Sequence, residues 1–180
     1  MIQLIITAIG LIILFSAAAA GISAAPWLPS RKRERHQLSE NLKLKDSDLV
    51  VDLGCGDGTM LFEIAKHHPN VTCIGYDISF LPLGIGLLRK VLSGGKYKNV
   101  KLRFGNLFKQ DISDATHVFI YLLTKSYPRL KAKFAAELKD EAMAIVEAWP
   151  MPDIEPAHVI KEEGALPIYI YSGKDFRDNG

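Results

Sequence analysis

Three glycines spaced two residues apart follow an apolar run in the stretch VVDLGCGDGTM, residues 50 to 60: Gly54, Gly56 and Gly58. Glycine lets a ligand approach the backbone closely, and this loop also carries two carboxylates, Asp52 and Asp57. The third glycine comes one residue too early for the dinucleotide fingerprint, and the lysine of a phosphate loop is missing. Because the two carboxylates would repel phosphate, we expect a ligand that carries positive charge.

Two further polar residues follow later apolar runs. Asp77 lies 25 residues after Asp52, and a carboxylate there can accept hydrogen bonds from both hydroxyls of a ribose. The amide of Asn106 can pair with an adenine ring, while Leu107 or Phe108 covers the face of the ring. Roles as turn residues or helix caps remain open for Asp52, Asp77 and Asn106. An adenosine with a cationic tail in place of phosphates is S-adenosylmethionine.

The elements that must position these residues alternate along the chain. Strands are expected at residues 48–53, 71–77, 100–104, 116–123 and 142–149, with helices at 58–68, 80–92 and 125–140 between them. A close pair of strands, at 158–163 and 166–172, ends the series. This order predicts an α/β fold, a Rossmann-like doubly wound and mostly parallel sheet with an antiparallel C-terminal hairpin. Such sheets bind ligands at the carboxyl ends of their strands.

Four stretches in this order, VVDLGCGDGT, IGYDIS, FGNLF and HVFIYLL, resemble the class I, seven-strand methyltransferases that depend on S-adenosylmethionine. Over about residues 24 to 171 the chain is also similar to small membrane-anchored protein lysine methyltransferases, whose mitochondrial members modify the ATP synthase c subunit and the adenine nucleotide translocase. The most suggestive stretch is NLFKQDISDATHVFIYLLTKSYPRLKAKFAAEL. The chain departs from that pattern at Asp77, Asn106 and Thr59, where glutamate, aspartate and arginine are common. These differences preserve the cofactor site and bear on the substrate.

The resemblance implies an enzyme with S-adenosylmethionine as its cofactor. We predict that ten residues of these motifs contact it: Asp52, Gly54, Cys55, Gly56, Asp57, Gly58, Asp77, Ile78, Asn106 and Leu107. No catalytic residue is assigned, because alignment of donor and acceptor can suffice for methyl transfer. Tyr121 and Trp149 end two expected strands, as walls of a substrate channel or as core aromatics. No metal site is expected, since Cys55 and Cys73 lack metal-ligand spacing.

The first 25 residues contain no charged side chain. As a helix, the 24 residues from Ile2 to Ala25 would span about 36 Å, enough for a hydrocarbon core of about 30 Å. We therefore expect one N-terminal transmembrane helix, with a cleaved signal peptide as the alternative, although its positively charged start is missing. Pro26 and Pro29 are expected to stop this helix, and Trp27 suits the membrane interface.

Four basic residues follow the apolar segment: Arg31, Lys32, Arg33 and Arg35. By the positive-inside rule they place the remaining chain in the cytoplasm or an equivalent compartment. We expect this cluster to contact anionic lipid. Nucleic-acid binding is the disfavoured alternative, because the run is short and has no interleaved aromatic residues.

The chain has 180 residues, 48% of them hydrophobic, and a formal net charge of +2, which suits one domain of ordinary size plus a short segment. We divide it into a transmembrane anchor (1–25), a basic juxtamembrane linker (26–38), a methyltransferase domain (39–172) and a tail (173–180). The expected activity is lysine N-methylation of a membrane-associated protein. A methyltransferase of a lipid or small hydrophobic molecule, or a non-catalytic membrane-tethered cofactor-binding module, remains the alternative.

Overall fold

The computed structural model describes residues 1–25 and 27–178. Seven strands form one sheet in the order β3-β2-β1-β4-β5-β7-β6. They are β1 (Leu49–Leu53), β2 (Thr72–Asp77), β3 (Val100–Phe104), β4 (His117–Ile120), β5 (Met143–Glu147), β6 (His158–Ile160) and β7 (Ile168–Ser172). The first five are parallel, while β7 pairs antiparallel with both β5 and β6. The predicted fold class, with its antiparallel hairpin at one edge, is confirmed.

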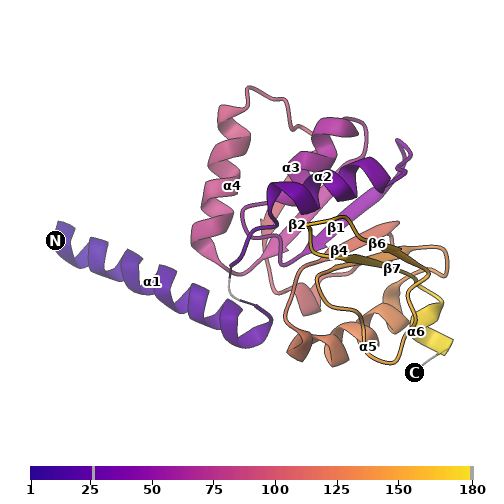
Figure 1. Ribbon diagram of the computed structural model, residues 1–180. Helices are drawn as coiled ribbons and strands as arrows, with labels where there is room; N and C mark the ends of the chain where they lie inside the picture. Colours follow the sequence, from indigo (N-terminus) through magenta and orange to yellow (C-terminus); the bar gives the residue numbers. More distant parts are fainter. Residues whose placement is uncertain (26, 179–180) are drawn as a thin grey trace.

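Helices cover both faces of the sheet (Figure 1). One face carries α2 (Lys32–Asn41), α3 (Thr59–His67) and α4 (Phe80–Leu92), and the other carries α5 (Tyr127–Glu137) and α6 (Asp175–Asp178). Neighbouring residues of β1 point to opposite faces, so Val50 joins the core under α3 and Val51 joins the core under α5. Burial on both faces explains why the central strands are continuous apolar runs.

The N-terminal helix α1 (Ile2–Ser23) projects from the domain (Figure 1). Its residues Ile2–Ile22 have a mean hydropathy of 2.5 and are almost entirely exposed. By its length and composition the helix could cross a membrane, and a signal sequence would have the same two properties. The helix ends at Ser23, before Pro29, and the expected role of Pro26 lies outside the described residues. On α1, Ser16 Oγ accepts a hydrogen bond from Phe80 N at 3.3 Å.

Helix α2 was not predicted, because residues 26–38 were expected to form a linker. Apart from Leu38 its sequence, KRERHQLSEN, is polar, so no apolar periodicity marks it. It packs against α3 and buries Leu38 together with the polar side chains of Glu34 and Gln37. The proposed boundary at residue 38 therefore falls inside this helix.

Several predicted elements are shorter in the structure, among them the strands expected at 142–149 and 158–163, which are β5 at Met143–Glu147 and β6 at His158–Ile160. β4 ends at Ile120 instead of residue 123, because the chain leaves the sheet there and enters the 3-10 turn η2 (Thr124–Ser126). Helix α5 begins at Tyr127 rather than residue 125, with a proline in its first turn, where no amide donor is required. The tail, expected at 173–180, contains the one-turn helix α6.

Candidate active site

The glycine loop between β1 and α3 depends on backbone conformations that favour glycine. Gly54, Gly56 and Gly58 have φ angles of +91°, +54° and +72°. A Cβ atom on Gly54 would lie 2.8 Å from Leu122 Cδ2, and one on Gly56 would lie 2.7 Å from Trp27 Cδ1. Trp27, expected at the membrane interface, thus lies directly against this loop. Glycine is therefore required at these positions for two reasons: the φ angles are positive, and a side chain would collide with neighbouring atoms.

A pocket with an empty volume of about 720 Å³, partly open to solvent, lies at the carboxyl edge of the parallel strands. Nine of the ten predicted cofactor residues line it, Gly58 being the exception. Its other walls come from the end of α1 and the segment after it, including Ala20, Ala24, Trp27 and Ser30. Distant segments therefore meet at the edge where an open α/β sheet binds ligands. Roles for the individual residues in binding remain predictions.

Asp52 lies at this edge near the end of β1, and it is buried, with 3% of its surface exposed. None of the hydrogen bonds among the described residues reaches its carboxylate. Burial raises the pKa of the Asp52 carboxyl well above its ordinary value, and the negative charge of Asp77 raises it further. A cationic group in the pocket would relieve this unfavourable charge.

Asp57, the other acidic residue of the loop, already has a cationic partner. Its carboxylate accepts a hydrogen bond from Arg89 of α4 at 2.8 Å and another from the Thr59 hydroxyl at 2.6 Å. Arg89 also donates to Thr59 at 2.9 Å. Asp57 therefore joins the loop to α4, and the uncompensated charge in this loop lies on Asp52.

Asp77 connects the ends of β2 and β1. One carboxylate oxygen accepts a hydrogen bond from Gly56 N at 2.7 Å, and the other accepts one from Ser79 N at 2.7 Å. The second contact is the turn role that the sequence left open. Each carboxylate oxygen has a further lone pair, so both can still accept from a ribose hydroxyl.

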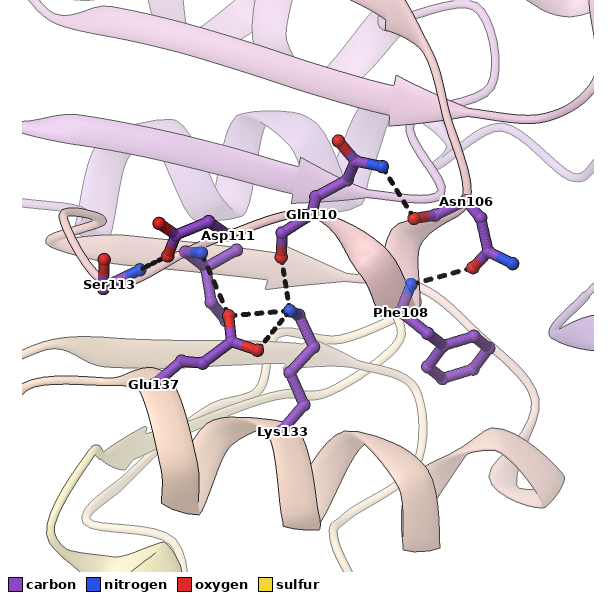
Figure 2. Close-up of polar contacts among 8 residues, drawn as sticks. Asn106, Phe108, Gln110, Asp111, Ser113, Lys133 and Glu137 are labelled. Carbon is purple, nitrogen blue, oxygen red and sulfur yellow. Dashed lines mark hydrogen bonds and ion pairs between the residues drawn. The ribbon is translucent and has the colours of Figure 1, made fainter.

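Asn106 caps the 3-10 turn η1 (Leu107–Lys109). Its side-chain oxygen accepts from Phe108 N at 3.0 Å, as Figure 2 shows, and its amide nitrogen donates to none of the described residues. The capping role is thus present, and the amide donor is available for an adenine ring. Leu107 is buried and lines the pocket, whereas the ring of Phe108 lies under Arg129 at 3.7 Å. Of the two candidates to cover a base, Leu107 has the better position.

The segment after η1 is tied to α5 by a buried lysine. Lys133 donates to the carbonyl of Gln110 and forms an ion pair with Glu137 at 2.7 Å (Figure 2). Gln110 in turn donates to the carbonyl of Asn106 at 2.9 Å. These contacts hold Asn106 and Leu107 at the mouth of the pocket.

Residues 52–158 match the protein family described as the ANTKMT methyltransferase domain, which covers more than half of the chain. The chain belongs to this methyltransferase family. A protein-lysine N-methyltransferase from Saccharolobus islandicus is 32% identical over 151 residues, which cover 81% of this chain and 92% of that protein. The Homo sapiens lysine N-methyltransferase named for the c subunit of ATP synthase is 27% identical, over 84% of this chain and 63% of its own length.

The methyltransferase is also similar in structure to an RNA methyltransferase from Salinibacter ruber in complex with S-adenosyl-L-homocysteine. The TM-score is 0.74 and the identity 25%, over 81% of this chain and 93% of that one. The predicted enzyme class is confirmed, and S-adenosylmethionine is its cofactor. The pocket suits it, since glycine backbones leave room and Asp52 offers a negative charge. When bound, the cofactor supplies a methyl group activated by its sulfonium.

A second buried carboxylate of this methyltransferase was not predicted. Glu147, at the end of β5, is fully buried and accepts a hydrogen bond from Ser30 Oγ at 2.6 Å, while its other oxygen has no partner among the described residues. Burial raises the pKa of Glu147 from 4.5 to about 7. Because Ser30 lines the pocket, Glu147 lies directly behind the pocket wall. An acidic residue that ends an apolar strand, as Asp77 does, was the signal available in the sequence.

The two aromatic residues predicted for a substrate channel lie together. The rings of Tyr121 and Trp149 are stacked with centroids 6.2 Å apart. Tyr121 lines the pocket, whereas Trp149 does not and is 42% exposed. Their role toward a substrate remains a prediction. Within the described residues, no group of three or more His, Cys, Asp or Glu side chains could hold a metal ion.

Proposed function

We propose that this methyltransferase modifies a lysine side chain of a membrane-associated protein. The observation that carries the proposal is the meeting of α1 with the cofactor pocket, because Ala20 of α1 and the two residues just after the helix, Ala24 and Ala25, form part of the pocket wall. A membrane crossed by α1 would therefore lie next to the site of methyl transfer. Tethering at that place raises the effective concentration of the enzyme near membrane proteins.

The lysine specificity is supported by the relatives. The Saccharolobus islandicus and Homo sapiens proteins are both named as lysine N-methyltransferases, and the human name specifies the c subunit of ATP synthase. The chain spans 63% of the human protein's length.

The charges around α2 support the orientation. Arg31, Lys32, Arg33 and Arg35 follow the apolar helix. If α1 crosses a membrane, these positive charges favour a location of the domain in the cytoplasm or an equivalent compartment. We retain residues 1–25 as the anchor and extend the methyltransferase domain, expected at 39–172, toward the N-terminus to include α2, which packs against α3.

Methyl transfer to lysine requires a neutral amine, since a protonated one has no free electron pair. Burial of the amine beside the rings of Tyr121 and Trp149, away from the carboxylates that face the cofactor, would favour its neutral form, because burial disfavours its charge. The loop, Asp77 and Asn106 would hold the cofactor in place, and the stacked rings of Tyr121 and Trp149 would position the aliphatic part of the lysine. Holding donor and acceptor in line is the main contribution expected of these residues.

The test uses the full chain with S-adenosylmethionine labelled in its methyl group and membranes from the source cells. We expect label in a protein band, and mass spectrometry should locate it on a lysine. Asp77→Ala should abolish the signal, whereas Asp114→Ala, whose side chain is 89% exposed, should keep it. Label only in extracted lipid would favour the lipid alternative, and cofactor binding without any transfer would favour the non-catalytic module.

A further inference from the structure

The outer face of α4 exposes apolar side chains along the whole helix. The helix buries Pro82, Leu83 and Gly86 against the domain. Seven large apolar side chains are exposed on it: Phe80, Leu81, Ile85, Leu87, Leu88, Val91 and Leu92. Val91 and Leu92 are each 76% exposed. A continuous apolar surface of this kind marks an interaction site.

This surface continues onto two neighbouring elements. Phe104, at the end of β3 and 56% exposed, stacks on Phe80 with ring centroids 4.5 Å apart. The hydrogen bond between Phe80 N and Ser16 joins the start of α4 to α1. The apolar face of α4 is therefore contiguous with the helix that is long and apolar enough to span a membrane.

The charged residues of α4 and of the segment that follows it have one sign. Between Asp77 and Asp111 the sequence contains no acidic residue and seven basic ones: Arg89, Lys90, Lys96, Lys98, Lys101, Arg103 and Lys109. Lys96 and Lys98, in the turn after α4, are exposed, and Lys96 lies beside Ile85, Leu88 and Leu92 of the apolar face. Basic side chains that flank an apolar helical face match an anionic lipid surface. A second copy would present the same positive charge, and a nucleic acid would leave the aliphatic side chains uncovered.

Figure 1 supports the same arrangement. Helix α4 runs across the direction of α1 and lies on the side of the domain toward which the N-terminus of α1 projects. A membrane crossed along α1 would therefore meet the outer face of α4.

We propose that the outer face of α4, together with Phe104, inserts into the surface of an anionic bilayer beside α1. This inference rests on the proposed membrane anchor. The contact would fix the rotation of the domain about α1. Because Ser79 and Asn106 line the pocket close to Phe80 and Phe104 in the sequence, it would also hold the pocket near the headgroups. Lysines just outside the bilayer would then be within reach.

The test places an environment-sensitive fluorophore at single positions of the full chain in vesicles. Native Cys55 and Cys73 are buried, so a label on Val91→Cys is selective. Matched controls are Leu11→Cys in α1 and Val159→Cys on β6, at the opposite edge of the sheet and 49% exposed. In vesicles of phosphatidylcholine and phosphatidylglycerol with nitroxide-labelled acyl chains, labels at positions 91 and 11 should be quenched and shifted to the blue. The label at position 159 should change in neither respect.

A second experiment tests the attraction between the basic side chains and the anionic lipid. Replacing Lys96 and Lys98 with glutamine, or omitting phosphatidylglycerol, should reduce quenching at position 91 and leave position 11 unchanged. Quenching at position 11 without quenching at position 91 would overturn the α4 contact and leave the anchor standing. Absence of quenching at both positions would overturn the anchor and the contact together. Self-quenching at position 91 that follows protein concentration rather than lipid, or a response to added RNA alone, would also overturn the proposal.

Discussion

Asp77 at the end of β2 accepts a hydrogen bond from Gly56 N in the loop after β1, at a distance of 2.7 Å. The carboxylate thus fixes the loop whose backbone lines the pocket. The same side chain also accepts from Ser79 N, at the start of α4. One residue therefore determines the geometry on both sides of the proposed ribose position.

Asp77→Ala should lose binding of S-adenosylmethionine. The glycine loop would lose the acceptor for Gly56 N, and the ribose hydroxyls would lose their proposed acceptor. Each hydrogen bond to a charged group contributes about 1.5–3 kcal/mol, so two of them predict a loss of affinity of at least a hundredfold. Calorimetric titration of the full chain in detergent measures this, with Asp114→Ala as the control. Tight binding by the alanine variant would contradict the assigned role.

Gly56→Ala should weaken cofactor binding and destabilise the fold. The new methyl group would meet Trp27 at 2.7 Å, and the φ of +54° costs a non-glycine residue about 1 kcal/mol or more. The control is Gly84→Ala in α4, where no atom lies within 4 Å of an added Cβ and where alanine should stabilise the helix by about 0.5–1 kcal/mol. Chemical denaturation measures both effects, and equal stability of the two variants would refute the argument.

Glu147→Gln should change how stability depends on pH. The pKa of Glu147 is raised from 4.5 to about 7, so the folded protein holds the proton more tightly than the unfolded chain does. The contribution of Glu147 to the free energy of unfolding is therefore fully present below pH 4.5 and is lost as the pH rises toward 7. Above that pH the glutamine variant should be more stable by up to about 3 kcal/mol, with no difference below pH 4.5.

The free energy of unfolding at several pH values tests this, with exposed Glu141→Gln as the control for the loss of one negative charge. A glutamine variant that is less stable than the wild type above pH 7 would show that the carboxylate is stabilised in the fold, contrary to the prediction.

Arg89→Ala should destabilise the domain because the carboxylate of Asp57, which is 5% exposed, would lose its cationic partner. Since Arg89 itself is partly exposed, we expect a loss of about 1–3 kcal/mol in the free energy of unfolding. The double variant Arg89→Ala with Asp57→Asn should recover part of that loss. If the double variant is no more stable than Arg89→Ala, the ion pair is not the cause.

Local patterns in the sequence determined most of the framework. The strands, three helices and the antiparallel hairpin were predictable, because apolar periodicity reflects which face of an element is buried. The glycine loop was also predictable, since positive φ angles at Gly54, Gly56 and Gly58 require that residue type. Asp77 and Asn106 could be assigned to the carboxyl edge of the sheet for the same reason, as each directly follows a strand.

The tertiary structure alone decided which distant groups meet. Ser30 and Glu147 are 117 positions apart and form a buried hydrogen bond. Arg89 of α4 forms an ion pair with Asp57 in the glycine loop. Helix α2 is polar and escaped prediction because its stability depends on packing against α3, and not on its own periodicity. Contacts of this kind depend on how segments that are distant in the sequence pack together. A sequence pattern shows only which face of a single helix or strand is buried.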